Sequence, residues 1–453
     1  MASVSDRAAV VAALTERELE RFAADHRRSG ELREAAADSL LSGVPMNWMT
    51  RWPGAFPVVF ESGAGASLTD VDGNSYVDFC LGDTGAMAGH SPAPTVAAAA
   101  ARLERGITTM LPSEDAGPVG AELSRRFGLR HWQFTLTATD ANRFAIRLCR
   151  EITGRPKILV FDHCYHGSVD ETFAELDGEG RVVAQAGNFG PPVPLAETTR
   201  VVQFNDVEGL ERELGAGDVA CVLTEPALTN VGIVLAEPGF HEAMRELTRA
   251  AGALLIIDET HTLCCGPGGY TRAEDLEPDL LTIGKAIAGG VPVGAYGMTD
   301  EVAAQVIAKT VWDAADENGI GGTLAGNALS MAATRATLEE VLTEEAFEQM
   351  IALAERFATG CEEVIAEFDL PWQATRLGCR VEYMFSPTPP RDGGEAAAAF
   401  DPPLDALLHL YMLNRGVLMT PFHMMALMSP ATTASDVDAH TDTLRAFAAE
   451  LTT

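Results

Sequence analysis

The chain has 453 residues, of which 47% are hydrophobic and 21% charged, a composition typical of globular proteins and outside the disordered range. Its 65 acidic residues against 32 lysines and arginines give a net charge of −33, which argues against nucleic acid or an anionic membrane surface as a partner. Only three residues are lysines, Lys157, Lys285 and Lys309, so chemistry that needs a lysine amine has three candidates.

The N-terminal residues predict an amphipathic helix, because the charged residues from Glu16 to Arg21 interrupt the apolar run that a signal peptide needs. No stretch approaches the roughly 18 apolar residues of a membrane span, so we expect no membrane partner and a cytoplasmic location. Eight cysteines lie scattered without a Cys-x-x-Cys pair, which favours reduced thiols over disulfides. The segments 163–166 and 261–265, which contain His and Cys, lack the spacing of a zinc site, so no metal is expected.

Four short apolar runs predict buried strands, at residues 157–161, 200–204, 219–223 and 253–258. Because their apolar character is nearly continuous, both faces of each strand are expected to be covered. Between the last two runs, apolar residues at helical spacing predict an amphipathic helix over residues 238–251. This alternation indicates a parallel sheet with crossover helices.

The flanking segments predict a separate layer of mixed structure. Residues 66–79 predict an antiparallel hairpin, since Asp72-Gly73-Asn74 supplies the positive φ of a tight turn. Residues 387–400, rich in Pro, Gly and Ala, are expected to form a surface loop. Three helices are predicted toward the C-terminal end, over residues 328–342, over residues 345–368, and from Leu404 to a glycine cap at Gly416.

Two residues at the predicted sheet edge point to a specific chemistry. Asp258 ends the most apolar strand, at the edge where open α/β folds bind ligands, and Lys285 follows the next apolar run and precedes glycines. A pyridoxal phosphate enzyme requires such a pair: the lysine amine forms a Schiff base with the cofactor, and the carboxylate keeps the pyridine nitrogen protonated. In the absence of a cofactor, Asp258 would simply cap the next turn.

A phosphate site is predicted where residues 135–142 precede a helix over residues 143–150. Threonine hydroxyls and backbone N–H groups converge there at a helix N-terminus, which is a ready anion site. Alone, the segment would only be an N-cap.

Seven short motifs occur in one order along the chain: residues 70–79, Gly89-His90, Cys164–Gly167, Glu225-Pro226, Ile257–Glu259, Ile283–Lys285 and Gly322–Asn327. Each is weak alone, but the ordered set is specific. By these motifs the chain, from roughly Pro57 to Gly416, resembles the fold-type I, class III aminotransferases. Within them it is similar to the subgroup that contains glutamate-1-semialdehyde aminomutase and the β-amino-acid transaminases.

The resemblance implies an α/β fold with a large domain, whose mostly parallel sheet is flanked by helices, and a smaller α+β domain from the N- and C-terminal segments. We therefore expect a large cofactor-binding domain over residues 86–330. Residues 1–85 are expected to contribute the N-terminal helix and the hairpin of the small domain, and residues 331–453 its C-terminal part. The working unit is expected to be a homodimer.

The resemblance also implies pyridoxal 5′-phosphate as the cofactor and assigns roles around it. Lys285 forms the Schiff base, Asp258 bonds the pyridine nitrogen, and Tyr165 stacks on the ring. The further residues implied to bind the cofactor are Ala138 and Thr139 at its phosphate, Thr323 at the phosphate of the neighbouring subunit, Glu225 beneath the site as a positioning residue, and His166 and His261.

Three departures from the family pattern stand near this site. The segment Thr137–Ala141 has Ala138 where the family has glycine and an aspartate where it has glutamate. His90 is followed by Ser-Pro-Ala-Pro rather than by the usual x-His-Pro. His261 stands where the family commonly has another long residue, so it either bonds the 3-oxygen of the cofactor or is a neutral buried histidine.

Fewer residues can be assigned to substrate recognition than to cofactor binding. A substrate carboxylate calls for an arginine, whose planar fork binds it with two hydrogen bonds. Arg51 lies in the segment that borders the substrate pocket in the subgroup, and Trp48 beside it predicts an aromatic wall; a solvated loop is the other interpretation of Arg51. Arg415 matches an Arg-Gly of the family, where substrate contact and a structural role remain open.

Three hypotheses follow for the reaction. As a transaminase, the protein would move nitrogen from a small amino acid, including a β-amino acid, or from an amine to a keto acid. As an aminomutase of the glutamate-1-semialdehyde type, or a related isomerase, it would move nitrogen within one substrate. As a non-enzymatic or metal-binding protein, it would keep the fold without the chemistry.

Overall fold

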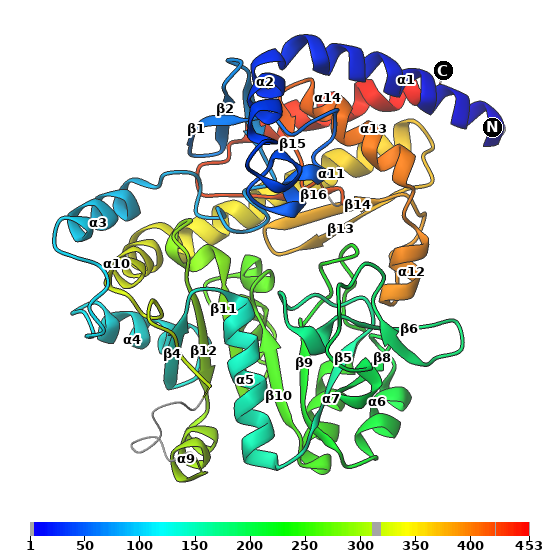
Figure 1. Ribbon diagram of the computed structural model, residues 1–453. Helices are drawn as coiled ribbons and strands as arrows, with labels where there is room; N and C mark the ends of the chain where they lie inside the picture. Colours follow the sequence, from blue (N-terminus) through cyan, green and yellow to red (C-terminus); the bar gives the residue numbers. More distant parts are fainter. Residues whose placement is uncertain (1–3, 310–318, 422, 453) are drawn as a thin grey trace. The chain divides into compact units, whose positions relative to one another are not determined.

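The computed structural model describes residues 4–309, 319–421 and 423–452 (Figure 1). The chain divides into two compact units. Unit 1 comprises Met1–Ser91, Gln349–Pro389 and Ala399–Thr453, and unit 2 comprises Pro92–Glu348 and Pro390–Ala398. Residues 331–348, expected in the C-terminal segment of the small domain, thus group with unit 2. No helix in the described ranges has the length and apolar character needed to cross a membrane.

Unit 2 contains a seven-stranded sheet in the order β4-β12-β11-β10-β9-β5-β8. Strand β12 is antiparallel to both of its neighbours, and the other adjacent pairs are parallel. The strands are β4 (His131–Thr135), β5 (Lys157–Phe161), β8 (Thr199–Val202), β9 (Val219–Thr224), β10 (Leu254–Asp258), β11 (Leu280–Gly284) and β12 (Gly294–Met298). This mostly parallel sheet with flanking helices confirms the predicted fold class (Figure 1).

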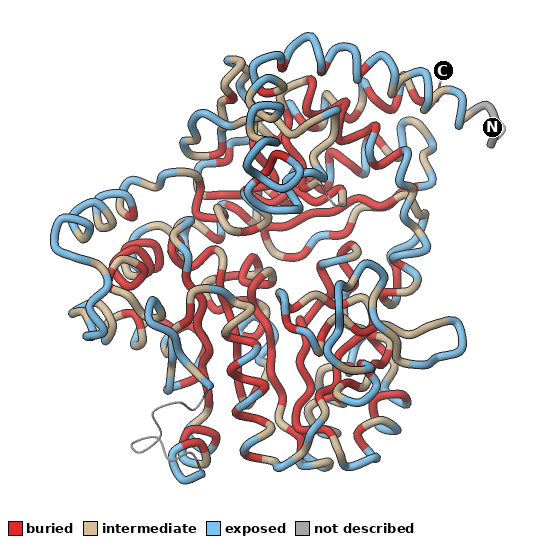
Figure 2. The backbone as a smooth tube through the Cα atoms, in the orientation of Figure 1, coloured by how far each residue is buried: buried red, intermediate tan, exposed pale blue. Residues whose placement is uncertain are grey.

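The central strands are buried along almost their whole length, as their continuous apolar runs predict (Figure 2). Strand pairing aligns their carboxyl ends, since Asp258 lies opposite Thr282 on β11 and Ile257 lies opposite Thr224 on β9. Side chains that follow these strands therefore gather at one edge of the sheet.

The helices of unit 2 lie around the sheet, and α4, α5, α6 and α7 pack against its strands (Figure 1). They are α3 (Ala93–Leu103), α4 (Ala116–Phe127), α5 (Ala138–Thr153), α6 (Val207–Leu214), α7 (Phe240–Ala251), α8 (Gly269–Ala273), α9 (Asp300–Lys309), α10 (Ala328–Ala336) and α12 (Gly393–Ala398). A π-helical turn, η7 (Thr337–Val341), follows α10 directly, and α11 (Glu344–Glu367) begins in unit 2 and continues into unit 1. A separate two-stranded sheet joins β6 (Ala174–Leu176) to β7 (Val182–Ala184).

Three expected boundaries are wrong in this unit, each for a local reason. The helix expected over residues 143–150 is α5 and already begins at Ala138, because Thr137 caps it by accepting from Asp140 N. Strand β8 ends at Val202 rather than at residue 204, because the chain turns at Asn205 with φ 68° and Asp206 then caps helix α6 by accepting from Gly209 N. The expected loop over residues 387–400 contains helix α12, whose first turn is capped where Glu395 N donates to Asp392 Oδ1 at 2.9 Å.

Unit 1 contains two smaller sheets. The predicted hairpin pairs β2 (Ser67–Asp70) with β3 (Ser75–Asp78), and the sheet is completed by β1 (Phe60–Ala64) and β15 (Val417–Leu418) in the order β1-β2-β3-β15. Strand β15 is parallel to β3, with Val417 opposite Val77. A second sheet has the order β13-β14-β16, from β13 (Gln373–Leu377), β14 (Arg380–Met384) and β16 (Met425–Leu427).

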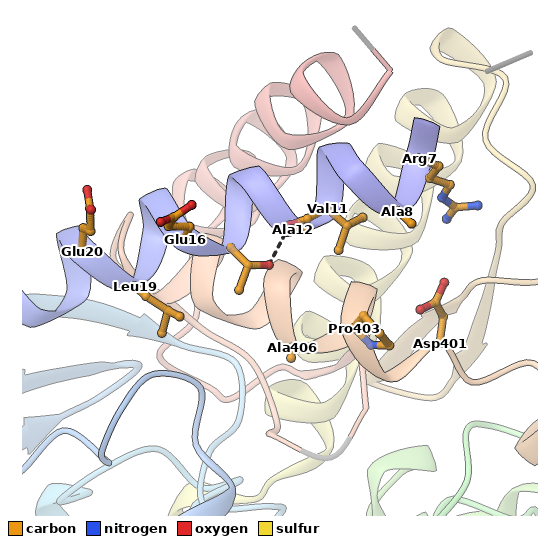
Figure 3. A pocket seen from close by; sticks show the side chains of 11 residues that line it. Arg7, Ala8, Val11, Ala12, Glu16, Leu19, Glu20, Asp401, Pro403 and Ala406 are labelled. Atoms are coloured by element: carbon orange, nitrogen blue, oxygen red, sulfur yellow. Dashed lines mark hydrogen bonds between the residues drawn. The ribbon is translucent and has the colours of Figure 1, made fainter. Parts of the chain in front are cut away.

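The helices of unit 1 include the predicted N-terminal one. They are α1 (Val4–Asp25), α2 (Arg27–Ala36), α13 (Pro402–Leu413), α14 (Ala434–Leu451) and most of α11. Phe22 of α1 packs into a core with Tyr76, Leu410 and Leu418. A groove of about 930 Å³ lies between α1 and α13, and side chains such as Val11, Leu19 and Pro403 line it (Figure 3).

Candidate active site

The predicted aspartate and lysine lie on neighbouring strands at the carboxyl edge of the large sheet. Asp258 is the last residue of β10, and Lys285 follows the last residue of β11. Lys285 adopts φ 50°, a left-handed conformation that few residues other than glycine show and that clusters at functional sites. Its strained backbone is a structural reason, independent of sequence motifs, to place chemistry at this lysine.

Asp258 is held by three donors. His166 Nδ1 donates to its Oδ2 at 3.0 Å, Asn142 Nδ2 donates to the same oxygen at 2.8 Å, and Thr260 N donates to Oδ1 at 3.0 Å. The carboxylate is buried, with 3% of the residue exposed. These three hydrogen bonds fix the orientation of the buried Asp258 carboxylate and compensate for its loss of water.

The electrostatics of the pair keep Asp258 ionised. Burial alone would raise the pKa of Asp258, but the hydrogen bond and charge of His166, with the bonds from Thr260 and Asn142, lower it to about 2. Burial would likewise lower the pKa of His166, yet the Cys164 sulfur and the Asp258 carboxylate raise it to about 10. An ionised carboxylate at this position fits a protonated pyridine nitrogen, which is the role expected for Asp258.

Asn142 is a site residue that the sequence did not identify in this role. Besides Asp258, its Nδ2 contacts His166 O at 3.1 Å, and its Oδ1 accepts from Thr282 Oγ1 at 2.6 Å. Asn142 belongs to the segment recognised as a phosphate site, but it lies one helical turn after Ala138, on the buried side of α5. A polar residue four positions after Ala138, on the apolar face of α5, was the signal in the sequence that could have identified it.

The expected phosphate site lies at the N-terminus of α5. Thr137 caps this helix by accepting from Asp140 N, and Thr139 Oγ1 accepts from Ser168 N at 3.1 Å. A methyl group at Gly284 would lie 3.0 Å from the Ala138 Cβ and 3.1 Å from its backbone N, so this helix end lies beside the residue that precedes Lys285. The helix begins at Ala138 despite the departure from the family glycine, and its first N–H groups and dipole fit an anion.

Gly167 is required where the loop after β5 approaches α5. Its φ is 77°, and a Cβ there would come within 3.0 Å of the Thr139 Cα and still closer to Thr139 Oγ1. We therefore expect Gly167→Ala to displace Thr139 and to weaken cofactor binding about tenfold or more, which corresponds to losing one charge-assisted hydrogen bond. Titration of the apoprotein with cofactor, followed by absorbance, measures this. Gly178→Ala, at a glycine with open space around it, is the control that should bind normally.

Three further predicted residues lie in unit 2 near this edge. Tyr165 is partly buried and packs edge-on against Phe173, with ring centroids 6.2 Å apart. Glu225 follows β9, is buried, and accepts a hydrogen bond from Thr229 Oγ1. His261 Nε2 lies 2.8 Å from the Lys285 Nζ.

The other two lysines are engaged elsewhere. Lys157 Nζ donates to Ala196 O at 2.8 Å and lies 3.7 Å from Asp218, and Lys309 Nζ donates to Ile152 O. Both therefore use their amines to bind backbone carbonyls, which leaves Lys285 as the candidate for covalent chemistry.

Three other expected residues lie on elements different from those that carry Asp258 and Lys285. Thr323 lies on an exposed loop of unit 2 that precedes α10. Trp48 and Arg51 lie on the short helix η2 (Asn47–Arg51) of unit 1, and both are exposed. Their roles toward the phosphate of a partner and toward the substrate stay predictions.

Arg415 has partners of its own within unit 1. Its Nη1 and Nη2 donate to the two carboxylate oxygens of Glu18 at 3.0 Å each, and its guanidinium lies 3.2 Å from the ring centroid of Tyr411. Burial would raise the pKa of Glu18, but Arg415, Asn414 and Arg17 lower it to about 2. These contacts favour the structural role for Arg415, as an anchor of helix α1, over substrate binding.

Comparison with known proteins agrees with this geometry. A family model described as Aminotransferase class-III matches residues 48–445. The chain belongs to the class-III aminotransferases. It is 34% identical over 392 residues to glutamate-1-semialdehyde 2,1-aminomutase of Desulfitobacterium hafniense (strain DSM 10664 / DCB-2), covering 85% of this chain and 89% of that protein.

Two solved structures extend the comparison to three dimensions. A glutamate-1-semialdehyde-aminomutase from Pseudomonas aeruginosa PAO1 is 51% identical, with a TM-score of 0.96 over 98% of this chain and 99% of that one. An omega-transaminase from Sphaerobacter thermophilus is 29% identical, with a TM-score of 0.84 over 93% of this chain and 97% of that one. A variant of the Pseudomonas protein was crystallised in complex with PMP.

Membership of this family confirms four expectations from the sequence: the class III resemblance with its subgroup, the fold-type I architecture, enzymatic activity and pyridoxal phosphate as the cofactor. It also makes the hypothesis of a non-enzymatic protein wrong. The family contains both transaminases and aminomutases, so membership alone does not choose between them.

Proposed function

We propose that this class-III aminotransferase moves an amino group from a small, carboxylate-bearing amino acid or amine to a keto acid, with Lys285 as the covalent lysine and Asp258 as the partner of the pyridine nitrogen. The observation that supports this most directly is the buried, ionised Asp258, aligned by strand pairing beside the strand that ends at Lys285. The candidate substrates include β-amino acids, with pyruvate or 2-oxoglutarate as the returning keto acid.

Each residue has a distinct task in this proposal. When bound, pyridoxal phosphate supplies an electron sink for the substrate's Cα. Asp258 holds positive charge at the ring nitrogen because His166 and Asn142 keep its carboxylate ionised and aimed. Thr139 and the first N–H groups of α5 bind the phosphate, and Tyr165 covers one face of the ring.

The substrate carboxylate is assigned to Arg51, with Trp48 as an aromatic wall. An arginine is suited to this role because its two N–H groups match a carboxylate. A transaminase must admit two substrates in turn, and both carry this group, so one arginine serves both. Arg415 is left out of the assignment, because Glu18 already occupies its guanidinium.

An aminomutase of the glutamate-1-semialdehyde type is the second candidate. The observation that favours it is the 51% identity, over nearly the whole of both chains, to the Pseudomonas protein that bears this name. Both candidates use the same residues for the first half of the reaction. They differ in whether the first product leaves before the second nitrogen transfer.

We also propose a homodimer in which Thr323 reaches the phosphate of the partner subunit. Thr323 lies on an exposed loop, and exposed apolar residues such as Met110, Leu111 and Leu324 are found in the same unit. A second subunit would cover such residues. A cytoplasmic location stays a prediction from the sequence.

The test follows nitrogen through repeated turnovers. Purified enzyme with bound cofactor is incubated with ¹⁵N-labelled amino compounds, with and without an added keto acid, and the products are analysed by mass spectrometry. We expect strict dependence on the keto acid, transfer of the label to it, and ping-pong kinetics. Product from glutamate-1-semialdehyde alone, with its nitrogen retained in the five-carbon skeleton, would assign the aminomutase reaction instead.

A further inference from the structure

We propose that His261 is a catalytic residue that accepts a hydrogen bond from the Lys285 amine and orients it for proton transfer. This inference rests on the proposed function, because it concerns the lysine assigned there to covalent chemistry. Its central observation is the 2.8 Å distance between His261 Nε2 and Lys285 Nζ.

Both neighbours of His261 in the chain are tied to buried carboxylates. On one side, Thr260 N donates to the Asp258 carboxylate. On the other, Thr262 Oγ1 donates to the buried carboxylate of Glu259 at 2.6 Å, and Tyr270 N donates to the same oxygen at 3.1 Å. The two acidic neighbours of His261 are therefore turned toward other partners, and Lys285 is the partner found for Nε2.

The direction of the bond follows from proton counting. A lysine ammonium has three N–H donors and no acceptor, so it can bond a histidine nitrogen only if that nitrogen is unprotonated. A doubly charged pair would place two donors and two like charges 2.8 Å apart. With Lys285 as an ammonium, Lys285 donates and His261 accepts through Nε2, with the ring proton on Nδ1.

This bond has a use in amino transfer. When the neutral Lys285 amine is not attached to the cofactor, it would take a proton from the substrate carbon and become an ammonium. The C–H bond breaks, an N–H bond forms, and the electron pair remains on the substrate. His261 accepts one N–H of that ammonium, which stabilises the new charge and directs the remaining N–H groups.

The alternative role is a bond to the 3-oxygen of the cofactor. The His261 ring lies at hydrogen-bond distance from the Lys285 amine itself. A role toward the 3-oxygen alone would leave the properties of Lys285 in the apoprotein independent of His261. The apoprotein therefore separates the two roles.

The first experiment measures how reactive Lys285 is without cofactor. Trace acetylation of the apoprotein at one fixed pH, read by mass spectrometry, compares Lys285 with Lys157 and Lys309 in the same sample. Because a charge-assisted bond stabilises the unreactive ammonium, we expect His261→Ala to raise relative labelling of Lys285 roughly tenfold. His261→Gln, whose amide oxygen also accepts, should stay near the wild type.

A second readout does not depend on access to the lysine. In apoprotein labelled with ¹⁵N-histidine, the His261 signals, identified by their loss in His261→Gln, should show protonation at Nδ1 and an unprotonated Nε2. Lys285→Met should shift the Nε2 signal and leave the other histidines unchanged. His131→Gln, at an exposed histidine on β4, is the matched control and should not alter labelling of Lys285.

The outcomes either support or overturn the inference. Unchanged Lys285 labelling in His261→Ala would overturn it. So would a His261 Nε2 chemical shift that is the same in the wild type and in Lys285→Met. Equal labelling in the Ala and Gln variants would show that space, and not an acceptor, sets the reactivity, and would overturn it too. Neither measurement involves amino transfer, so both stand even if every amino donor fails in the test of the proposed function.

Discussion

Lys285→Ala is expected to abolish amino transfer, lowering the rate on the order of a thousandfold or more, because the variant loses both the covalent attachment of the cofactor and the base for proton transfer. The fold should survive, since the side chain is partly exposed and alanine fills less space. Cofactor would still bind through the phosphate site at α5, without covalent attachment. The measurement is single-turnover transfer together with the absorbance spectrum of the bound cofactor.

The other two lysines supply matched controls. Lys157→Ala and Lys309→Ala remove amines that bond backbone carbonyls, so they should keep both activity and spectrum, with a small loss of stability. Borohydride reduction of the wild type, followed by peptide mapping, should attach the cofactor to Lys285. A cofactor label on either of the other lysines would show that the assignment is wrong.

Asp258→Asn should bind cofactor and lose turnover by on the order of a hundredfold to a thousandfold, the usual cost of removing one preorganised electrostatic partner. The amide keeps the size of the carboxylate but not its charge, so the ring nitrogen loses the anion that keeps it protonated. The donors His166 and Asn142 would then face a neutral group. The rate and the pH dependence of the cofactor absorbance measure the effect.

Glu259→Gln is the control for this substitution. Glu259 is the next residue along the chain and is also a fully buried carboxylate. Its hydrogen-bond donors are Thr262, Tyr270 and Thr271, whereas Asp258 is bonded by His166. Burial raises the pKa of Glu259 above its ordinary value, whereas the pKa of Asp258 is lowered. We expect this variant to change stability more than turnover. Near-normal activity in Asp258→Asn would show that the electron-sink argument is wrong for this enzyme.

The features predictable from sequence were those that local patterns determine. The runs at 157–161 and 219–223 are strands because both of their faces are buried, which leaves an uninterrupted apolar signal. Asp258 and Lys285 were identifiable because strand ends in a parallel sheet meet at one edge. The turn at Asp72-Gly73 was likewise set by the chemistry of two adjacent residues.

What the sequence could not supply depends on partners distant along the chain. Helix α12 lies in a segment whose glycines suggested a loop, yet Gly393 is packed against the 162–163 backbone and side chain, leaving no room for a Cβ. The role of Asn142 depends on Thr282 and Asp258 approaching it from other strands. The approach of His261 to Lys285 likewise joins two loops that no spacing rule connects.

The pairing of β3 with β15 has a consequence for how the protein is made. Val77 of β3 pairs with Val417 of β15. The N-terminal hairpin therefore leaves the ribosome long before strand β15 has been synthesised. Almost all of unit 2 lies within residues 92–348, so nearly all of its residues have been synthesised before β15 is made. We expect cotranslational folding to begin there, with the first segment exposed and dependent on chaperones until translation nears its end. On ribosomes stalled before residue 417, brief proteolysis should spare unit 2 and cut helix α1, whereas a protected α1 would contradict this order.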